Sequence, residues 1–336
     1  MFRKGGLKMR VQIFLLMLCI YHNSAYKALG KIAPRPFVIT PQSIAQDILI
    51  KYKTPEEIPW HQYFEMDMQS AKLLDSGLFQ EAEWRLGEEG NKFGEEAVHA
   101  FLSKIMREGN VYDLKDLGMG GATKPQAATL PFGVIGVFKE KKSLHPSASY
   151  KSEIAAYEFD RLIGFRFVPM TVKRKMKNRK GSMQYFVKNS QSVVKLKEYR
   201  RSKNLNVFDY LISNKDRNEG NLLIANRREI AIDHGLALRG INLLGRYLKF
   251  TDRVANTFGF ASHPIRQVII HPSRNIEEYQ ADQQILKNLD DLSLEELKSA
   301  LKKNLDESRI FRIYDKKNKL LDKLKDENLY DSDSSF

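Results

Sequence analysis

Cysteine is almost absent from this sequence. The chain has 336 residues and a single cysteine, Cys19, so no disulfide bond can form within it. Long apolar runs are scarce as well. The run VQIFLLMLCIY at 11–21 is too short to span a bilayer comfortably, and no second membrane segment is visible.

The apolar run at 11–21 lies between a basic start, MFRKGGLKMR, and the small and polar residues HNSAYKALG. This order is typical of a secretory signal peptide, and we expect residues 1–25 to be one, with cleavage after Ala25. Its removal would leave a mature chain without cysteine, which suits an oxidising compartment. The protein would then be exported to a periplasm, a secretory lumen or the cell exterior. The alternative is a buried N-terminal helix or strand in a cytoplasmic protein.

Acidic residues are outnumbered by basic ones, with 41 Asp and Glu against 55 Lys and Arg. The net charge of +14 favours anionic partners, which include nucleotides, nucleic acid, anionic lipid and acidic proteins. The run KRKMKNRK at 173–180 fits an acidic substrate or an anionic membrane surface, although a solvated hairpin tip would look the same. Because no aromatic residue interleaves this run, nucleic acid is an unlikely partner.

The residue composition of the first half of the chain changes twice. Residues 30–55 are spaced by prolines and are expected to form a strap over the surface. Helical spacing follows in 68–87 and 94–109. From 111 to 142 short β-prone runs alternate with glycine and proline, which predicts three strands and a turn at Gly118, Gly120 and Gly121.

The later segments alternate between helix and hairpin. A helix is predicted over 152–165, with Ser152 as N-cap and Gly164 as its stop. Strands are predicted on both sides of the basic run, and a short helix over 206–215. Two more strands join at a turn near 226–228, and the chain from 240 on looks helical, with a capping box at Ser293 and Glu296.

Five polar residues stand in an order that suits phosphoryl transfer. This reaction needs a cation for the phosphates, an acid that fixes the cation, oxygen ligands for a metal ion, and a carboxylate near the attacking hydroxyl. Lys139 ends a strand, and Glu153 opens the next helix, placed to pair with it. Asp216 follows an apolar helix and suits a catalytic base. Asn221 and Asp233 flank the predicted hairpin and suit Mg²⁺.

Simpler interpretations exist for each of these residues. Asp216 and Asp233 could be ordinary turn residues. Lys141 and Lys142 compete with Lys139, which is preferred because it directly follows the apolar end of its strand. First-turn glutamates are common for dipole reasons alone, and Glu158 lies on the same helix as Glu153. For His234, packing or hydrogen bonding is favoured over metal binding, since no second His or Cys stands at ligand spacing.

The segments SEIAAYEFDRLIGFRFVPMTV and VFDYLISNKDRNEGNLLI…AIDHGLAL resemble blocks of the phosphatidylinositol 3-/4-kinase-like superfamily. They are similar to type II phosphatidylinositol 4-kinases and to secretory-pathway kinases of the Golgi casein kinase family. The ordinary protein-kinase motifs His-Arg-Asp and Asp-Phe-Gly are absent. The resemblance covers residues 115–240 well and the C-terminal part loosely.

The resemblance implies an α+β, two-lobed protein-kinase-like fold. Residues 111–190 would form the small lobe and 191–330 the large lobe. The resemblance does not extend to 26–110, which we expect to form a helical extension on the small lobe, and the sequence of 331–336 predicts a disordered tail. Lys139 would bind ATP phosphates and pair with Glu153, and Gly120 and Gly121 would cover those phosphates. Asp216 would be the base, and Asn221 and Asp233 would hold Mg²⁺ or Mn²⁺.

The expected function is therefore that of an atypical, ATP-dependent kinase acting on a hydroxyl group. A protein acceptor is slightly favoured over a phosphoinositide. The alternatives are a lipid kinase and a pseudokinase that binds nucleotide as a scaffold. A basic nucleic-acid-binding protein is a further alternative that rests on charge alone.

Overall fold

The computed structural model describes residues 39–118, 124–141, 149–196, 199–214, 216–238 and 275–331. The predicted signal peptide, Gly120 and Gly121 lie outside the described residues, as does the predicted tail apart from Asp331. Within the described ranges, no helix combines the length and apolar character that a membrane crossing requires.

The first described part of the chain is a group of helices: α2 (Pro41–Lys51), α3 (Trp60–Tyr63), α4 (Met68–Asp75), α5 (Phe79–Glu88) and α6 (Lys92–Glu108). The expected surface strap over 30–55 is wrong for 41–51. Thr40 caps α2 in a capping box with Ser43, and Pro41 occupies the first helical position, where proline costs no hydrogen bond. Ala45 and Ile48 are buried, so this helix belongs to the core.

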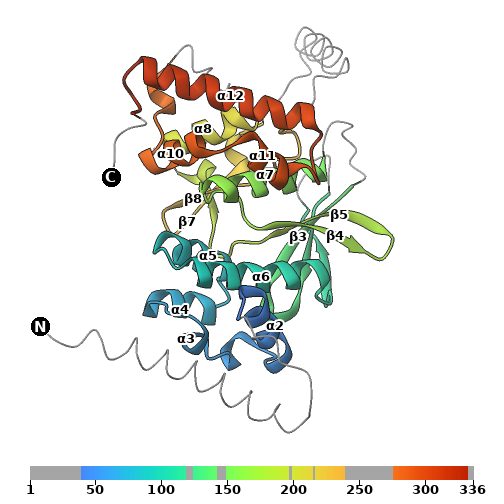
Figure 1. Cartoon of the computed structure of the whole chain (residues 1–336). Coiled ribbons are helices and arrows are strands. Elements are labelled where there is room, and N and C mark those ends of the chain that lie inside the picture. The colour runs from blue at the N-terminus through green and yellow to red at the C-terminus, as the bar shows by residue number, and fades with distance from the viewer. Residues whose placement is uncertain are drawn as a thin grey trace, which may run out of the picture.

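The predicted small-lobe strands form one antiparallel sheet in the order β1-β2-β3-β5-β4. Its strands are β1 (Asp113–Asp116), β2 (Gln126–Thr129), β3 (Ile135–Glu140), β4 (Thr171–Met176) and β5 (Arg179–Tyr185). Figure 1 shows this sheet between α6 on one side and α7 (Tyr150–Ile163) on the other. Both helices pack against β4 and β5.

The start of α7 differs from the prediction. Ser149 is the N-cap, with its hydroxyl accepting the N–H of Lys151, and Ser152 lies inside the first turn. Ser152 instead donates its backbone N–H to the carbonyl of Ser149, at 3.0 Å. Gly164 ends the helix at a φ of 87°, as predicted, because glycine adopts this conformation without a Cβ penalty.

A second, three-stranded antiparallel sheet has the order β6-β7-β8. It consists of β6 (Gln191–Ser192), β7 (Leu222–Ala225) and β8 (Arg228–Ala231). The helices α8 (Lys203–Leu211), α10 (Gln283–Asp291) and α11 (Leu294–Leu301) all pack against the long C-terminal helix α12 (Glu307–Asp326). Helix α8 begins earlier than predicted, because Ser202 caps it, and the capping box at Ser293 is confirmed. The α+β class and the two-lobed arrangement are as predicted (Figure 1).

Candidate active site

The hairpin of β7 and β8 brings Asn221 close to Asp233. Asn226 and Arg227 form its two-residue turn and both have positive φ, which matches the twist of the paired strands. At the open end the backbone N–H of Ile232 donates to the carbonyl of Asn221 at 3.1 Å. Asn221 and Asp233 therefore flank the same end of the hairpin.

Lys139 lies at the centre of the site. Its Nζ is 2.7 Å from Oε1 of Glu153 and 2.9 Å from Oδ1 of Asp233. Three separate elements meet here: β3, α7 and the segment after β8. The competing Lys141 is exposed, Lys142 lies outside the described residues, and Glu158 accepts a hydrogen bond from Asn304 instead. The pairing of Lys139 with Glu153 was expected from the sequence, but its sharing with Asp233 was not.

The three charged groups at this contact shift one another's pKa values. Burial disfavours the charged form of Lys139, but the carboxylates of Glu153 and Asp233 outweigh it and raise the pKa of Lys139. Burial raises the pKa of Glu153, with Lys139 acting in the opposite direction. For Asp233 burial acts upward, yet the ammonium of Lys139 prevails and lowers the pKa. Lys139 therefore keeps its positive charge, and Asp233 keeps its negative charge.

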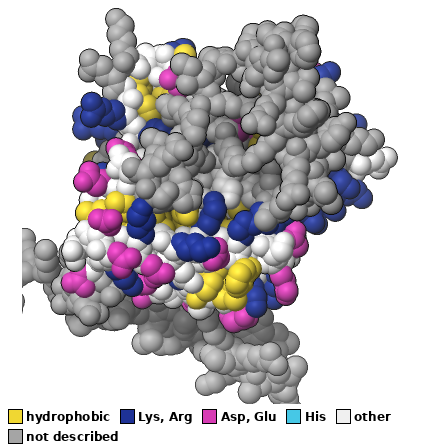
Figure 2. Space-filling view, turned by 90° about the horizontal axis from the view of Figure 1, so that it is seen from above, with side chains coloured by type: hydrophobic (Ala, Val, Ile, Leu, Met, Phe, Trp, Pro, Cys, Tyr) yellow, Lys and Arg dark blue, Asp and Glu magenta, His cyan; other side chains and the backbone are white. Residues whose placement is uncertain are grey.

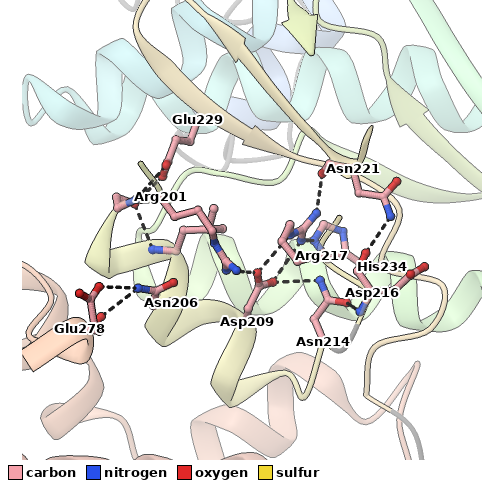
Figure 3. Close-up of polar contacts among 12 residues, drawn as sticks. Arg201, Asn206, Asp209, Asn214, Asp216, Arg217, Asn221, Glu229, His234 and Glu278 are labelled. Carbon is pink, nitrogen blue, oxygen red and sulfur yellow. Dashed lines mark hydrogen bonds and ion pairs between the residues drawn. The ribbon is translucent and has the colours of Figure 1, made fainter. Parts of the chain in front are cut away.

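Two asparagine side chains fix the backbone around Asp216 (Figure 3). The backbone N–H of Asp216 donates to Oδ1 of Asn214 at 3.1 Å. Nδ2 of Asn221 donates to the carbonyl of Asp216 at 2.8 Å. The second contact assigns Oδ1 of Asn221 as the atom that can face a metal ion.

Arg217 joins these parts, and the sequence reasoning missed its role. Its Nε and Nη2 donate to the two carboxylate oxygens of Asp209, each at 3.1 Å. Its Nη1 donates to the backbone carbonyls of Asn221 at 2.6 Å and Ile232 at 2.8 Å. The remaining donor of Nη2 meets Nε2 of His234 at 2.7 Å. All five guanidinium donors are thus used, on both sides of the hairpin opening (Figure 3).

His234 is a neutral hydrogen-bonding residue. Burial, followed by the charges of Arg217 and Lys139, lowers the pKa of His234 well below its usual range. Since Nε2 accepts from Arg217, the ring proton resides on Nδ1. The backbone N–H of His234 donates to Oε2 of Glu153 at 2.9 Å, which holds the carboxylate that faces Lys139. These contacts agree with the expectation that His234 is a packing or hydrogen-bonding residue.

The donor set suits a hard divalent cation that is shared with phosphate. Asp233 has a φ of 58°, a strained conformation for a residue with a Cβ and a recurrent feature of functional sites. Within the described ranges, no group of three His, Cys, Asp or Glu residues could hold a metal alone. Asn221 and Asp233 offer one amide and one carboxylate oxygen, which fits Mg²⁺ because that ion usually completes its shell with water and substrate phosphates.

The family model described as "Phosphatidylinositol 3- and 4-kinase" matches residues 133–260. Among solved structures, the chain is similar to the Golgi casein kinase, with 14% identity, 88% of this chain and 93% of that chain covered, and a TM-score of 0.46. The Helicobacter pylori proinflammatory kinase CtkA is similar with 14% identity, 66% of this chain and 95% of that chain, and a TM-score of 0.41. No curated protein matches the sequence.

The matched segment contains Lys139, Glu153, Asp216, Asn221 and Asp233. Over residues 133–260, which contain all five residues of the site, the chain is therefore similar to the phosphatidylinositol 3- and 4-kinases, and this match supports a kinase.

Proposed function

We propose that the chain transfers the γ-phosphate of ATP to a hydroxyl group of a protein, assisted by Mg²⁺ or Mn²⁺. The observation that carries this proposal is the position of Lys139. A largely buried ammonium held by Glu153 and Asp233 from two other elements is a cation suited to phosphate, and it is joined directly to the carboxylate that we assign to the metal ion.

Each residue then has a defined part. Lys139 binds the α- and β-phosphates, and Glu153 fixes its side chain. Asn221 and Asp233 would hold the metal ion, which would neutralise charge on the phosphate oxygens. Asp216 accepts the proton of the acceptor hydroxyl as its oxygen bonds to the γ-phosphorus. The bond from that phosphorus to the bridging oxygen breaks, and ADP leaves.

A row of lysines favours an acidic polypeptide as the acceptor. Lys180 lies opposite Lys175 in the sheet, and its carbonyl accepts the N–H of Lys141 at 2.7 Å, so the three side chains lie on one face. Lys139 and Lys173 are both paired with Ser182 in the next row, which places the lysine row on the face of Lys139.

Lys141, Lys175 and Lys180 of this row are exposed, and so is Lys173 of the next row. Within the described ranges none of the four is paired with a carboxylate. In Figure 2 dark-blue side chains gather at the right-hand edge, where the β4–β5 hairpin projects in Figure 1. Like charges directly opposite in a sheet are unfavourable, so an anionic partner would relieve them. A row across three strands is about 10 Å long, which suits an extended acidic segment.

The test is an acceptor comparison with intact-mass detection. The full chain is incubated with ATP and Mg²⁺ or Mn²⁺, and either an acidic protein or phosphoinositide vesicles. Added phosphate on the protein supports the proposal. Transfer to the vesicles alone would show a lipid kinase. Metal-dependent ATP binding without any transfer would show a pseudokinase.

We also propose that the protein is exported after removal of residues 1–25, and N-terminal sequencing of the mature protein tests this.

A further inference from the structure

Helix α5 is polar in sequence but is buried around most of its circumference. Gln80, Glu81, Glu83 and Trp84 are all less than a tenth exposed. Burial of so many polar groups is costly unless each finds a partner. The partners of α5 come from both lobes, which is unexpected for an extension that merely covers one of them.

The N-terminal end of α5 is attached to the small lobe. The hydroxyl of Tyr185, at the end of β5, donates to the carbonyl of Gly77 at 2.8 Å. The backbone N–H of Met170, just before β4, donates to Oε1 of Gln80. Residues 186–190 connect the two sheets directly after Tyr185, so α5 starts beside the connection between the lobes.

Helix α5 also contacts the turn of the β7–β8 hairpin in the large lobe. Nδ2 of Asn226 donates to Oε2 of Glu81. The guanidinium of Arg228 binds both carboxylate oxygens of Glu88, at 2.5 and 2.9 Å. It also lies over the ring of Trp84, at 5.3 Å from the centroid. This turn is the closed end of the hairpin whose open end carries Asn221 and Asp233.

A third contact leads from α5 to α7. Oε1 of Glu83 is 3.1 Å from Nδ1 of His99 on α6, and the hydroxyl of Tyr157 on α7 is 3.0 Å from the same nitrogen. Arg161 of α7 pairs with Glu96 of α6 at 2.5 Å. Because α7 carries Glu153, the helices that hold the hairpin turn also hold the partner of Lys139.

We infer that the N-terminal helices α5 and α6 brace the two lobes against each other. They fix α7 on one side and the β7–β8 turn on the other. Lys139, Glu153 and Asp233 therefore keep one relative position before nucleotide binds. The positioning residues are Glu88 and Arg228, neither of which touches the reacting atoms. The catalytic consequence rests on the proposed function, whereas the structural claim does not.

Charge reversal tests the brace. The variants are Glu88→Arg, Arg228→Glu and the double exchange, which restores the pair in the opposite order. The control is Arg85→Glu, since Arg85 lies on the same helix and its ion pairs within the described residues are with Asp67 and Glu89 of the N-terminal helices. Spin labels on Lys115→Cys in β1 and Phe311→Cys in α12, in a Cys19→Ser background, report the distance between the lobes.

Without nucleotide, we expect a single narrow distance distribution in the parent and in Arg85→Glu. Either single reversal should broaden it, and the double exchange should narrow it again. The KM for ATP should rise about fivefold in the single reversals and recover in the exchange, which corresponds to ~1 kcal/mol. A general loss of stability would leave no such recovery.

An unchanged distance distribution in both single reversals would overturn the brace, and so would broadening that the double exchange fails to reverse. The distance measurement needs no turnover. If the distributions behave as expected but no variant transfers phosphate to any acceptor, the brace stands and the proposed kinase function fails.

Discussion

Replacing Arg217 with methionine should destabilise the protein more than the loss of any neighbouring arginine. Methionine retains much of the volume but none of the donors. Asp209 would keep Arg201 at 2.6 Å and Asn214 at 2.9 Å, so its buried charge stays partly compensated. The carbonyl of Ile232 and Nε2 of His234 would lose the donor that the structure gives them.

The magnitude follows from these contacts. Breaking a buried ion pair by removing one partner costs about 3–5 kcal/mol, part of which is the penalty for unsatisfied polar groups. The side chain of Arg217 is only 1% exposed, so water cannot compensate for its loss. Arg217→Lys should recover part of this, because an ammonium cannot reproduce the bidentate contact with Asp209.

Urea unfolding measures this prediction, with Arg201→Met as the matched control. Arg201 donates to the same carboxylate through Nη2 alone and is 14% exposed, so its loss should cost about 1 kcal/mol. If Arg217→Met proves no more destabilising than Arg201→Met, then Arg217 does not hold the two sides of the hairpin opening together.

Three further predictions concern the site, the fold and the acceptor. Glu153→Ala should lower kcat/KM for ATP by about 10²-fold, because Lys139 loses its contact to α7. Glu158→Ala is the control, and initial rates that fall equally in both variants would contradict the role of Glu153. Burial raises the pKa of Asp160 to about 7, so the contribution of Asp160 to the unfolding free energy should be greatest below about pH 4 and fall by about 4 kcal/mol as the pH rises to about 7. Asp160→Asn should flatten this dependence, and an equally steep decline in that variant would assign it to other groups. Reversing Lys175 and Lys180 to glutamate should raise the KM for an acidic protein, with a smaller rise at high salt, and leave the KM for ATP unchanged. Reversal of the exposed Lys319 on α12 is the control and should change neither KM. An unchanged KM for the acidic protein would show that the lysine row does not bind the acceptor.

The site could be predicted as far as local pattern reaches. A strand that ends in lysine, a glutamate in the next helix and a hairpin flanked by Asn221 and Asp233 are short-range features, and the structure brings Lys139, Glu153 and Asp233 together. Arg217 and Asp209 were missed, although one signal was available. Asp209 stands among Val207, Phe208, Tyr210 and Leu211, and an acid in so apolar a helix needs a buried partner.

The errors in the fold have equally local causes. Both Ser149 and Ser152 precede the apolar spacing of α7, and the choice between them depends on which hydroxyl meets a free backbone N–H. The proline spacing of 30–55 suggested an extended segment, but Pro41 lies in the first turn of α2, where proline is compatible with a helix. The contacts of α5 with Asn226 and Arg228 join residues about 140 apart in the sequence, and no periodicity can reveal such contacts.

The most direct test of the central claim separates binding from transfer at Asp216. ATP affinity and phosphate transfer to an acidic protein are measured in parallel, with Mg²⁺ and with Mn²⁺, for the full chain and for Asp216→Asn. We expect transfer to fall by at least about 10²-fold in the variant while ATP affinity stays unchanged, because Asp216 acts on the acceptor hydroxyl and not on the nucleotide. Equal transfer by both proteins would contradict the assignment of the base, and with it the proposed mechanism.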